Sequence, residues 1–473
     1  MPGTAAIFDL DRTLIAGSPA AIFERHLASA GLPTARTLPL AGTLDRWYEH
    51  FGENPLTVAT GSVGQRLGRG WSVATVAAAA EAAAIELGAA LQPFARPLLD
   101  EHRHAGRVLV LATPAPEPLV APLARRLGFD HVVATRFGVD GGAFTGEIDG
   151  PVVWAEGKVR ALEAWSEEAR IALSGCHAYS GSFSDALLLA QVAHPVAVNP
   201  DPQLAALAAL RRWPVRHLDV PDGVSKVLGR ELQEWTRPLL RPEAVPYARF
   251  EFAGLEHVPL SGPAIVAFNH RSYFDPTVMG LVAARVGRPV RGLGKKELFD
   301  VPLVGRLARM AGGIRVERSS GSDEPLEQAA LALEGGELVM IAPQGTIPRG
   351  AAFFDPELKG RWGAARLAQR TGAPVIPVGL WGTEAVWPRS SRLPRLSPLR
   401  RPLVTAHVGP PVPLGHTDVD ADTRAIMAAI VAQLPVEARR RHQPTEAELR
   451  RTFPPGYRGD PRAEADRRPG TDT

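Results

Sequence analysis

The sequence is poor in cysteine, in net charge and in long apolar runs. Its 473 residues include one cysteine, Cys176, which excludes an intramolecular disulfide or a multi-cysteine zinc site and is typical of a reducing compartment. The 53 basic and 50 acidic residues nearly balance, and basic residues do not alternate with aromatic ones, so we expect no nucleic-acid partner. The small excess of +3 suits an anionic substrate or an anionic lipid surface.

No stretch reaches the roughly 18 uncharged apolar residues that a membrane-spanning helix needs. The nearest, residues 74–91, carries Glu81 and Glu86 and is alanine-rich, which predicts an ordinary helix. The N-terminus lacks the basic and apolar regions of a signal peptide, so we expect a cytoplasmic chain. With 45% hydrophobic and 22% charged residues the composition is that of a globular protein, and the length predicts two or three domains.

The strand and helix patterns divide the chain into an N-terminal and a C-terminal half, both α/β. Residues 1–220 alternate apolar strands with helical patterns, which predicts a Rossmann-like parallel sheet, and the mostly helical residues 16–95 interrupt it as an insert. Prolines and glycines mark a linker at 221–248, and a second α/β pattern covers 249–436. Residues 437–473 are rich in Arg, Pro and Gly, which predicts a disordered basic tail.

The most informative segment of the C-terminal half places a histidine five residues before an aspartate. His270 and Asp275 directly follow the apolar run Ala264–Phe268, which predicts a strand. A histidine at the end of a strand, held by a carboxylate, is the arrangement that a general base needs to take a proton from an alcohol. The pair alone is also compatible with a surface histidine beside a helix-capping aspartate.

Three further segments favour the catalytic interpretation. They read GGIRVER at 312–318, LVMIAPQGT at 338–346 and PVIPV at 374–378. In this order and spacing the four segments resemble the lysophosphatidic acid acyltransferase (PlsC-type) family over about residues 245–415.

This resemblance implies an acyl transfer without a covalent enzyme intermediate and without a cofactor. His270 would take the proton of the acceptor hydroxyl, while Asp275 would orient the imidazole. The implied donor is the thioester of an acyl-coenzyme A or an acyl carrier protein. The implied acceptor is a lysophospholipid, above all 1-acylglycerol 3-phosphate, and the implied product is phosphatidic acid.

A phosphate on the acceptor needs fixed cations and N–H donors. Arg318 is the strongest candidate, and the turn at Gly345 and Thr346 offers backbone N–H groups. Lys295, followed by Lys296, is a further candidate, although a solvated surface pair is an equal alternative.

The third segment departs from the family pattern at two positions. Gln344 stands where the family has glutamate, and Ile347 stands where it has arginine. Arg349 is the candidate to replace the lost cation. These departures leave the fold assignment intact and the identity of the acceptor open.

Two apolar sets with nearby basic residues, the first of them at helical spacing over 224–239, suggest amphipathic helices that lie in a membrane interface. We expect a peripheral position on the inner face of the membrane, with an anionic membrane surface as partner, or else two ordinary core-facing stripes. The first set is Val224, Leu228, Leu232, Trp235 and Leu239, and the second is Leu298, Phe299, Val301, Leu303, Val304, Leu307 and Met310.

Asp9 and Asp11 stand two residues apart directly after the first predicted strand. This segment resembles the haloacid dehalogenase superfamily near its phosphoserine phosphatase branch, in which Asp9 and Asp11 match the nucleophile and the acid/base. Thr113 and Lys158 match its phosphate-binding threonine and its balancing lysine, and residues 16–95 match its cap.

One motif of the superfamily is incomplete. Gly181 stands where the family has a metal-binding aspartate, which leaves Asp9, Asp11 and Asp185 as the predicted ligands for Mg²⁺. The loss of a carboxylate predicts an impaired phosphatase. The alternatives are a bifunctional phosphatase and acyltransferase, or a non-catalytic lipid-binding scaffold; the intact His270–Asp275 pair argues against the scaffold.

Overall fold

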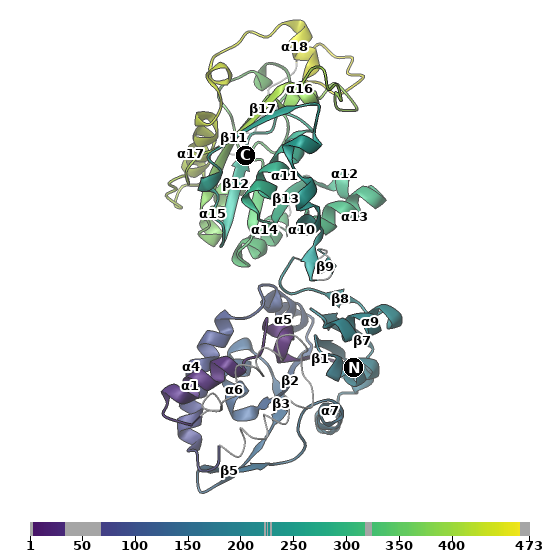
Figure 1. The fold of residues 1–473 in the computed structure, drawn as a ribbon, viewed down its shortest axis with the longest axis vertical. Coiled ribbons are helices and arrows are strands. Elements are labelled where there is room, and N and C mark those ends of the chain that lie inside the picture. Colours follow the sequence, from purple (N-terminus) through teal and green to yellow (C-terminus); the bar gives the residue numbers. More distant parts are fainter. Residues whose placement is uncertain are drawn as a thin grey trace. The chain divides into compact units, whose positions relative to one another are not determined.

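The computed structural model describes residues 3–33, 68–221, 224, 226, 227, 229–316 and 324–463, and it divides into two compact units, Met1–Asp222 and Gly223–Thr473. Both units are α/β, which confirms the predicted fold class (Figure 1). Part of the expected cap, Arg318 and Leu228 lie outside the described residues. No helix in the described ranges is long and apolar enough to cross a membrane.

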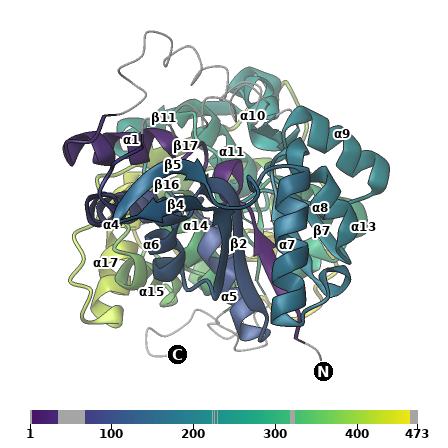
Figure 2. The ribbon, with the colours of Figure 1, turned by 90° about the horizontal axis from the view of Figure 1, so that it is seen from below.

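The first unit is built on a six-stranded sheet in which every pairing is parallel. The neighbouring strands β1 (Ala5–Phe8) and β2 (Val108–Pro116) are largely apolar, as expected for a sheet covered on both faces. Helix α7 (Glu156–Ala169) lies to one side of β2 and α6 (Glu117–Leu127) to the other (Figure 2). In sheet order the strands are β3 (His131–Thr135), β2 (Val108–Pro116), β1 (Ala5–Phe8), β6 (His177–Ser180), β7 (His194–Val198) and β8 (Val215–Arg216).

The described part of the insert is helical and packs on the same side as α6. Helices α1 (Ala20–Ser29) and α4 (Val73–Ala89) contact each other, and α4 contacts α6. An antiparallel hairpin of β4 (Phe137–Asp140) and β5 (Ala143–Ile148) completes this side, because Phe144 joins the small apolar cluster of Leu27, Val76 and Ala79. The remaining α-helices in the part of this unit that the structure describes are α5 (Ala95–His104), α8 (Ala186–Gln191) and α9 (Pro202–Arg211).

The second unit has a seven-stranded sheet between two apolar layers. Along β12, Ala264 and Val266 face the layer that contains α11, whereas Ile265 and Ala267 face the layer of α14, α15 and α17. This alternation follows from the two-residue period of a strand. The strands, in sheet order, are β11 (Arg249–Ala253), β17 (Leu403–Val408), β16 (Val375–Trp381), β12 (Ala264–Phe268), β15 (Leu338–Ile341), β13 (Val290–Lys295) and β14 (Ile314–Val316).

The strands next to β12 run in one direction, because β12 pairs parallel with both β15 and β16, and β15 pairs parallel with β13. The carboxyl ends of these strands therefore meet at one edge of the sheet, where polar side chains gather in α/β folds. The helices of the unit are α10 (Leu232–Thr236), α11 (Asp275–Val286), α12 (Lys296–Phe299), α13 (Pro302–Met310), α14 (Glu324–Glu334), α15 (Gly363–Thr371), α16 (Thr383–Val386), α17 (Val419–Ala432) and α18 (Glu446–Arg451).

The predicted amphipathic helix at 224–239 does not form. Lys226–Val227 and Arg230–Glu231 pair as the short antiparallel strands β9 and β10, and Gly229, at φ +75°, turns the chain between them. Only the five residues of α10 are α-helical, and the short 3-10 turn Arg237–Leu239 follows them. The four-residue spacing of apolar side chains was therefore a misleading signal in a segment with a glycine turn.

The prediction of a disordered tail from residue 437 is wrong for its described part, up to residue 463. Helix α18 begins with a capping box between Thr445 and Glu448, and Leu449 and Phe453 are buried. The Thr452 hydroxyl accepts a hydrogen bond from Gly350 N, at 2.8 Å. A good cap and two buried apolar side chains are enough to order a segment whose composition is otherwise polar.

Candidate active sites

The carboxyl end of β12 directs His270 beyond the sheet. Asn269, the residue before it, pairs its side-chain amide with the backbone of Leu380 on β16: Oδ1 accepts from Leu380 N at 2.7 Å, and Nδ2 donates to Leu380 O at 2.9 Å. The amide thus prolongs the ladder between the two strands by one residue. His270 begins the loop to α11 with its backbone fixed on this side.

His270 and Asp275 form the predicted pair. The two side chains meet at 2.7 Å between Nδ1 and Oδ2, and Asp275 is the first residue of α11. The same carboxylate oxygen accepts from the backbone N–H groups of Arg271, at 2.7 Å, and Ser272, at 2.9 Å. Asp275 is completely buried, whereas the side chain of His270 is 19% exposed. Because Nδ1 faces an acceptor, it carries the proton, and Nε2 is the nitrogen that can accept one.

Gln344 connects the turn after β15 to the histidine. Its Oε1 accepts from His270 N at 2.7 Å, and its side chain is buried. Gly345, at φ +67°, then turns the chain, as an α-left position favours glycine. A neutral amide oxygen makes the contact that positions the histidine, so this contact does not require the glutamate of the family pattern.

The predicted cations of the acyltransferase site are only partly described. Arg318 lies outside the described residues, and the structure describes no side chain for Lys295, which ends β13. Thr346 and Arg349 are half-buried in the segment that follows Gly345. The role of Arg349 as a replacement cation stays a prediction.

Two arginines that the sequence did not single out lie against the same turn. The side chain of Arg361 lies over Gly345, since a Cβ there would be 3.3 Å from its Cδ and Nε, and Arg361 N donates to Pro343 O at 2.8 Å. Arg389 is buried and donates to the carbonyl of Ile347, 42 residues away in the chain. Arginine therefore approaches the turn from other segments, although Ile347 replaces the one in the motif.

Arg271 locks the loop that holds the pair. Its guanidinium lies 4.2 Å from the ring centre of Trp381 and 4.5 Å from that of Phe353, and Nη2 donates to Glu384 Oε1 at 2.7 Å. These three partners come from the end of β16, from α16 and from the segment after the Gly345 turn. The same residue donates its backbone N–H to Asp275, so the side chain fixes the peptide that orients the carboxylate.

The N-terminal unit also assembles most of its predicted residues at the carboxyl ends of strands. Lys158 Nζ lies 3.0 Å from Asp9 Oδ1 and 2.7 Å from Asp185 Oδ2, and Thr13 donates to Asp9 Oδ2 at 3.1 Å. Ser180 donates to the same oxygen of Asp185 at 2.7 Å. Lys158 is 1% exposed, so its charge is neutralised inside the protein by the two carboxylates.

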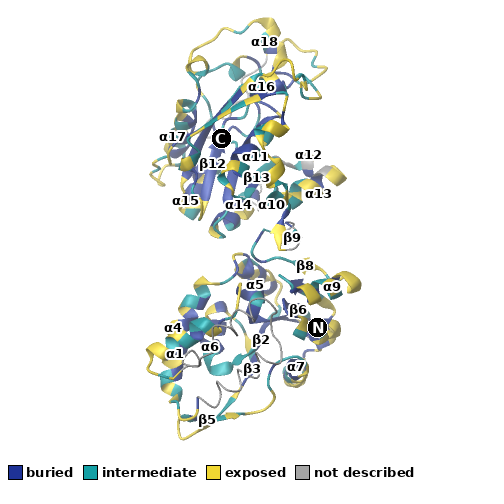
Figure 3. Cartoon of the chain, viewed as in Figure 1, coloured by how far each residue is buried: buried dark blue, intermediate teal, exposed yellow. Residues whose placement is uncertain are grey.

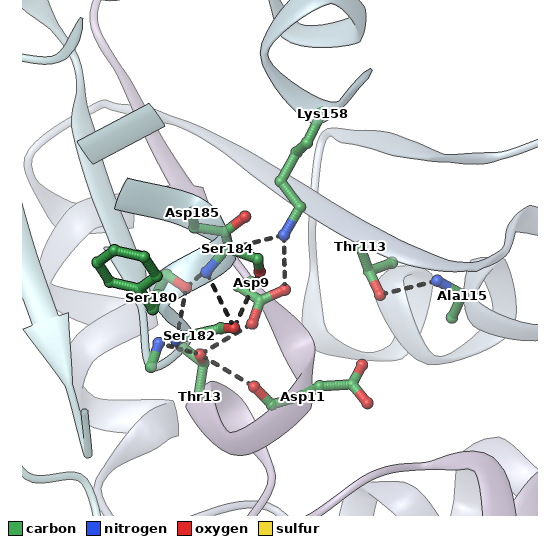
Figure 4. A network of polar contacts seen from close by, with 12 residues as sticks. Asp9, Asp11, Thr13, Thr113, Ala115, Lys158, Ser180, Ser182, Ser184 and Asp185 are labelled. Atoms are coloured by element: carbon green, nitrogen blue, oxygen red, sulfur yellow. Dashed lines mark hydrogen bonds and ion pairs between the residues drawn. The ribbon is translucent and has the colours of Figure 1, made fainter. Parts of the chain in front are cut away.

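Asp11 and Thr113 line the same buried region, and the Asp11 carbonyl accepts from the Thr13 hydroxyl at 3.2 Å. Figure 4 shows the Asp11 carboxylate directed away from Lys158, and Thr113 accepts from Ala115 N at 3.2 Å. Both side chains are buried. The structure thus brings Asp9, Lys158 and Asp185 into contact and leaves Asp11 and Thr113 beside them.

The predicted Mg²⁺ ligands are not arranged as a metal site. Among the described residues, no group of three or more His, Cys, Asp or Glu side chains could hold a metal ion. Asp185 turns one oxygen to both Lys158 and Ser180. A donor set that lacks the carboxylate of position 181 and uses Asp185 for an ion pair does not fit a hard divalent cation. Mg²⁺ binding by Asp9, Asp11 and Asp185 therefore stays a prediction, which the arrangement of the described residues does not favour.

The backbone around Gly181 leaves no room for a side chain. A Cβ at this position would lie 2.6 Å from Val198 O and 2.9 Å from Arg12 O, so the backbone has closed on the space that a side chain would need. Gly181 N donates to Thr13 Oγ1 at 2.9 Å, and Gly181 O accepts from Asp201 N at 2.9 Å. The loop is adapted to glycine on both sides.

The comparisons with known proteins agree with the division into two units. Residues 6–190 match the model of the haloacid dehalogenase-like hydrolases, and residues 249–381 match the acyltransferase model. The "Inhibition of morphological differentiation protein" of Streptomyces azureus is 34% identical over 226 residues, which are 46% of this chain and 78% of that protein. The chain belongs to the haloacid dehalogenase-like hydrolases through its N-terminal half and carries an acyltransferase domain in its C-terminal half.

A phosphoserine phosphatase of Mycobacterium tuberculosis is 33% identical to the haloacid dehalogenase-like half over 226 residues, 47% of this chain and 73% of that protein. Among solved structures, the 1-acyl-sn-glycerophosphate acyltransferase PlsC of Thermotoga maritima matches 42% of this chain and 78% of its own, at 21% identity and a TM-score of 0.31.

Proposed function

We propose that the acyltransferase domain transfers an acyl group from the thioester of an acyl-coenzyme A or an acyl carrier protein to a lysophospholipid, above all 1-acylglycerol 3-phosphate. The observation that supports this proposal best is the His270–Asp275 pair. Asp275 is buried and holds Nδ1, while the ring remains 19% exposed for a substrate. The product would be phosphatidic acid, a precursor of phospholipids.

In the proposed reaction, Nε2 of His270 takes the proton of the acceptor hydroxyl as its oxygen attacks the thioester carbonyl carbon. The carbonyl oxygen becomes an oxyanion, and backbone N–H groups near the site are the groups suited to stabilise it. The C–S bond then breaks, and the proton on Nε2 passes to the leaving thiolate. Asp275 stabilises the imidazolium throughout, and the transfer needs no cofactor.

The arginines around the turn after β15 support an acceptor with a phosphate group. Arg361 lies over Gly345, and a guanidinium beside backbone N–H groups is well suited to phosphate oxygens. Arg318 and Lys295 remain candidates on sequence grounds, together with Thr346 and Arg349. The acceptor itself lies in a bilayer, so we infer that the protein works at an anionic membrane surface, on its cytoplasmic face.

A panel of acceptors tests the substrate. Thiol release from acyl-coenzyme A is measured with lysophosphatidic acid, lysophosphatidylcholine and monoacylglycerol, and His270→Ala serves as the blank. Arg361→Ala and Arg318→Ala should each raise KM for lysophosphatidic acid by about tenfold or more, with KM for the donor unchanged. Arg370→Ala, an exposed arginine at the end of α15, is the matched control. Equal rates with monoacylglycerol would exclude a phosphate-specific acceptor.

For the haloacid dehalogenase-like unit we propose a retained scaffold with little or no phosphatase activity. The Lys158 pairing of Asp185 and the closed backbone at Gly181 support this choice. Its relatives include a phosphoserine phosphatase, and Asp9, Asp11 and Lys158 are all present, so a bifunctional chain is the second candidate. Hydrolysis of phosphoserine with and without Mg²⁺, compared between wild type and Asp9→Asn, decides between the two.

A further inference from the structure

Helix α13 turns apolar side chains to solvent. Leu303 is 71% exposed and Leu307 is 48% exposed, and Val301 just before the helix is 48% exposed. Leu303, Leu307 and Met310 follow the i, i+4, i+7 spacing that forms one stripe on a helix. Figure 3 shows the exposed residues of α13 at the periphery of its unit.

The opposite side of α13 is fixed to the domain, so this exposure is not the result of a detached helix. Gly305 is buried against the backbone of Phe299, where a Cβ would lie 1.9 Å from Phe299 O. Phe299 itself is 3% exposed, and Arg309 lies over its ring. The docked face therefore leaves the leucine stripe pointing outward in a defined orientation.

Residues after the β10 strand prolong this apolar surface. Trp235, Leu239 and Leu240 are 45%, 68% and 39% exposed. Gln233 links their segment to the end of α13, because its Nε2 donates to Ala311 O at 2.6 Å and to Val290 O at 2.8 Å. Trp235 and Leu239, the last residues of the apolar set at 224–239, thus lie in a segment that contacts the end of α13, although that set does not form one helix.

Exposed arginines flank the apolar residues. Arg306 and Arg309 lie on α13 beside the leucine stripe, and Arg230, Arg237 and Arg241 lie around Trp235 and Leu239. The combination of an outward apolar stripe with flanking guanidinium groups is complementary to a bilayer with anionic headgroups: the apolar groups enter the interface, and the arginines meet phosphates. A purely apolar protein partner would leave the arginines without a role.

The start of α13 follows the edge of the sheet that carries the catalytic pair, whereas the residues after β10 lie toward the other end of β13, where Gln233 contacts Val290 and Arg237 contacts Gly287. Strands β12 and β13 both flank β15 in parallel, so their carboxyl ends lie at one edge. His270 follows β12, and α12 begins at Lys296 directly after β13, with α13 two residues beyond α12. Val301 and Leu303, at the start of α13, are therefore the part of the surface that is nearest along the chain to this edge.

We propose that Val301, Leu303, Leu307 and Met310, together with Trp235, Leu239 and Leu240, form the surface on which the acyltransferase domain lies against an anionic bilayer. This inference rests on the proposed function for its choice of lipid as the occupant. It names the residues of contact, which neither the family match nor the fold specifies.

Sedimentation of the full chain with vesicles tests the surface independently of turnover. The vesicles contain phosphatidylcholine and phosphatidylglycerol in equal amounts. Leu303→Glu/Leu307→Glu should lower the apparent affinity by about tenfold or more, because two apolar contacts are replaced by carboxylates that anionic lipid repels. Leu187→Glu/Leu210→Glu, on the other unit and with 50% and 80% exposed side chains, is the matched control and should bind as the wild type does.

The arginines are tested by lipid charge. Arg306→Gln/Arg309→Gln should weaken binding to the mixed vesicles about fivefold or more and leave binding to pure phosphatidylcholine unchanged. Thiol release with a dispersed short-chain acceptor is measured for every variant, which separates loss of the surface from loss of the fold.

Unchanged vesicle binding by the double leucine variant overturns the surface, even if turnover is normal. If the wild type binds vesicles through these leucines but shows no turnover, the proposed membrane surface is supported and the proposed reaction is rejected. If the exposed leucines instead hold two copies together, the wild type dimerises without lipid and the variant does not, which also overturns the proposal.

Discussion

Each unit of this chain buries one basic side chain between two carboxylates, with different surroundings. In the haloacid dehalogenase-like unit Lys158 lies between Asp9 and Asp185, at the carboxyl edge of the sheet and among the motif residues. In the acyltransferase unit Arg291 lies between Glu231 and Glu337, at the start of β13 and away from the strand ends that hold His270. The same electrostatic arrangement thus occurs at a family motif in one unit and as a link between segments in the other.

The comparison teaches that pairing and burial of charge do not by themselves identify an active site. Lys158 and Arg291 are both at most 1% exposed, and their partners leave them no opening to a substrate. His270 differs because its carboxylate partner is buried while its own side chain stays 19% exposed. The His270–Asp275 pair thus differs from the networks of Lys158 and Arg291 in two respects. A substrate can reach the histidine, and the aspartate fixes which ring nitrogen carries the proton.

The largest effect that we expect concerns this open pair. His270→Ala should lower kcat for acyl transfer by about a thousandfold or more, since among the described residues His270 is the side chain that Asp275 orients to accept the proton. Asp275→Asn should also lose most activity, because the wrong tautomer is held. Asp9→Asn, the corresponding change at the motif of the other unit, should leave acyl transfer unchanged. Thiol release by purified variants measures all three, and near wild-type turnover of His270→Ala would refute the mechanism.

The buried arginine should matter for stability and not for chemistry. Arg291→Met leaves Glu231 and Glu337 facing each other without a cation, which typically costs about 3–5 kcal/mol. The loss in the free energy of unfolding is measured by urea unfolding of the full chain, from the transition that belongs to the acyltransferase unit. Arg370→Met, at an exposed position, should cost less than about 0.5 kcal/mol. An unchanged midpoint for Arg291→Met would mean that the pairing with Glu231 and Glu337 is not maintained in solution.

The sequence was sufficient for the parts of these sites that depend on local order. His270 and Asp275 are joined by one short loop at a strand end, so their spacing predicted the contact. The hydrogen bond from His270 N to Gln344 spans 74 residues, and that from Arg389 to Ile347 spans 42, so nothing near either residue in the chain signals them. Arg361 belongs to a basic pair before α15, but only the folded turn brings it over Gly345.

Average composition or spacing predicts two segments wrongly, because it does not include the backbone conformation or the burial of single residues. Apolar residues every four positions suggested one helix at 224–239, whereas Gly229 makes a hairpin turn within it. The polar tail contains Leu449 and Phe453, whose burial decides its order despite the surrounding Arg and Pro. In both segments a few particular residues outweigh the average pattern.

Acid should destabilise the first unit through His102. Burial, followed by the nearby His177 and Arg107, lowers the pKa of His102 to about 4. Its Nδ1 accepts from Arg107 at 3.1 Å, so Nε2 donates to the Tyr179 hydroxyl at 2.7 Å, and a proton on Nδ1 would face the guanidinium. An unfolded histidine titrates near pH 6.5. Below pH 6.5 the unfolded chain protonates this histidine, whereas the folded chain keeps it neutral until about pH 4. The free energy of unfolding therefore decreases as the pH falls from 6.5 to 4, by about 3 kcal/mol.

Denaturant midpoints of the first unit, measured between neutral pH and about pH 4, check this expectation. The variant His102→Gln keeps a neutral hydrogen-bonding side chain and should have a shallower dependence on pH than the wild type. His194→Gln, an exposed neighbour, is the control. Equal slopes for the wild type and His102→Gln would assign the acid sensitivity to other groups.

The closed backbone at Gly181 predicts that restoring the family's aspartate does not restore a metal site. The side chain of Gly181→Asp would meet Val198 O and Arg12 O, and forced packing of this kind costs about 1–3 kcal/mol. We expect lower stability of the first unit and no gain in Mg²⁺ binding by calorimetry. Gly181→Ala separates the steric effect from the carboxylate. Mg²⁺-dependent phosphatase activity that rises in Gly181→Asp, or that is already robust in the wild type and lost in Asp9→Asn, would overturn the scaffold proposal.

The smallest effect that we expect concerns Arg271, which forms an ion pair with Glu384 and directly follows the partly exposed His270. Arg271→Gln removes the Glu384 contact and the packing between Trp381 and Phe353, and so loosens the peptide that donates to Asp275. Because the pair still forms, kcat should fall only about tenfold, with both KM values unchanged, as expected for a lost positioning contact.

Glu384→Gln should have a similar effect, and the double variant should lose little more than either single one, because both remove the same restraint. Arg271→Lys keeps the charge but not the planar stacking, so its kcat should lie between those of Arg271→Gln and the wild type. A rise in KM for lysophosphatidic acid with kcat unchanged would show instead that Arg271 contacts the acceptor. In that case the acyltransferase unit would use its paired cation for substrate binding, and the contrast with the enclosed Lys158 would become a contrast in accessibility alone.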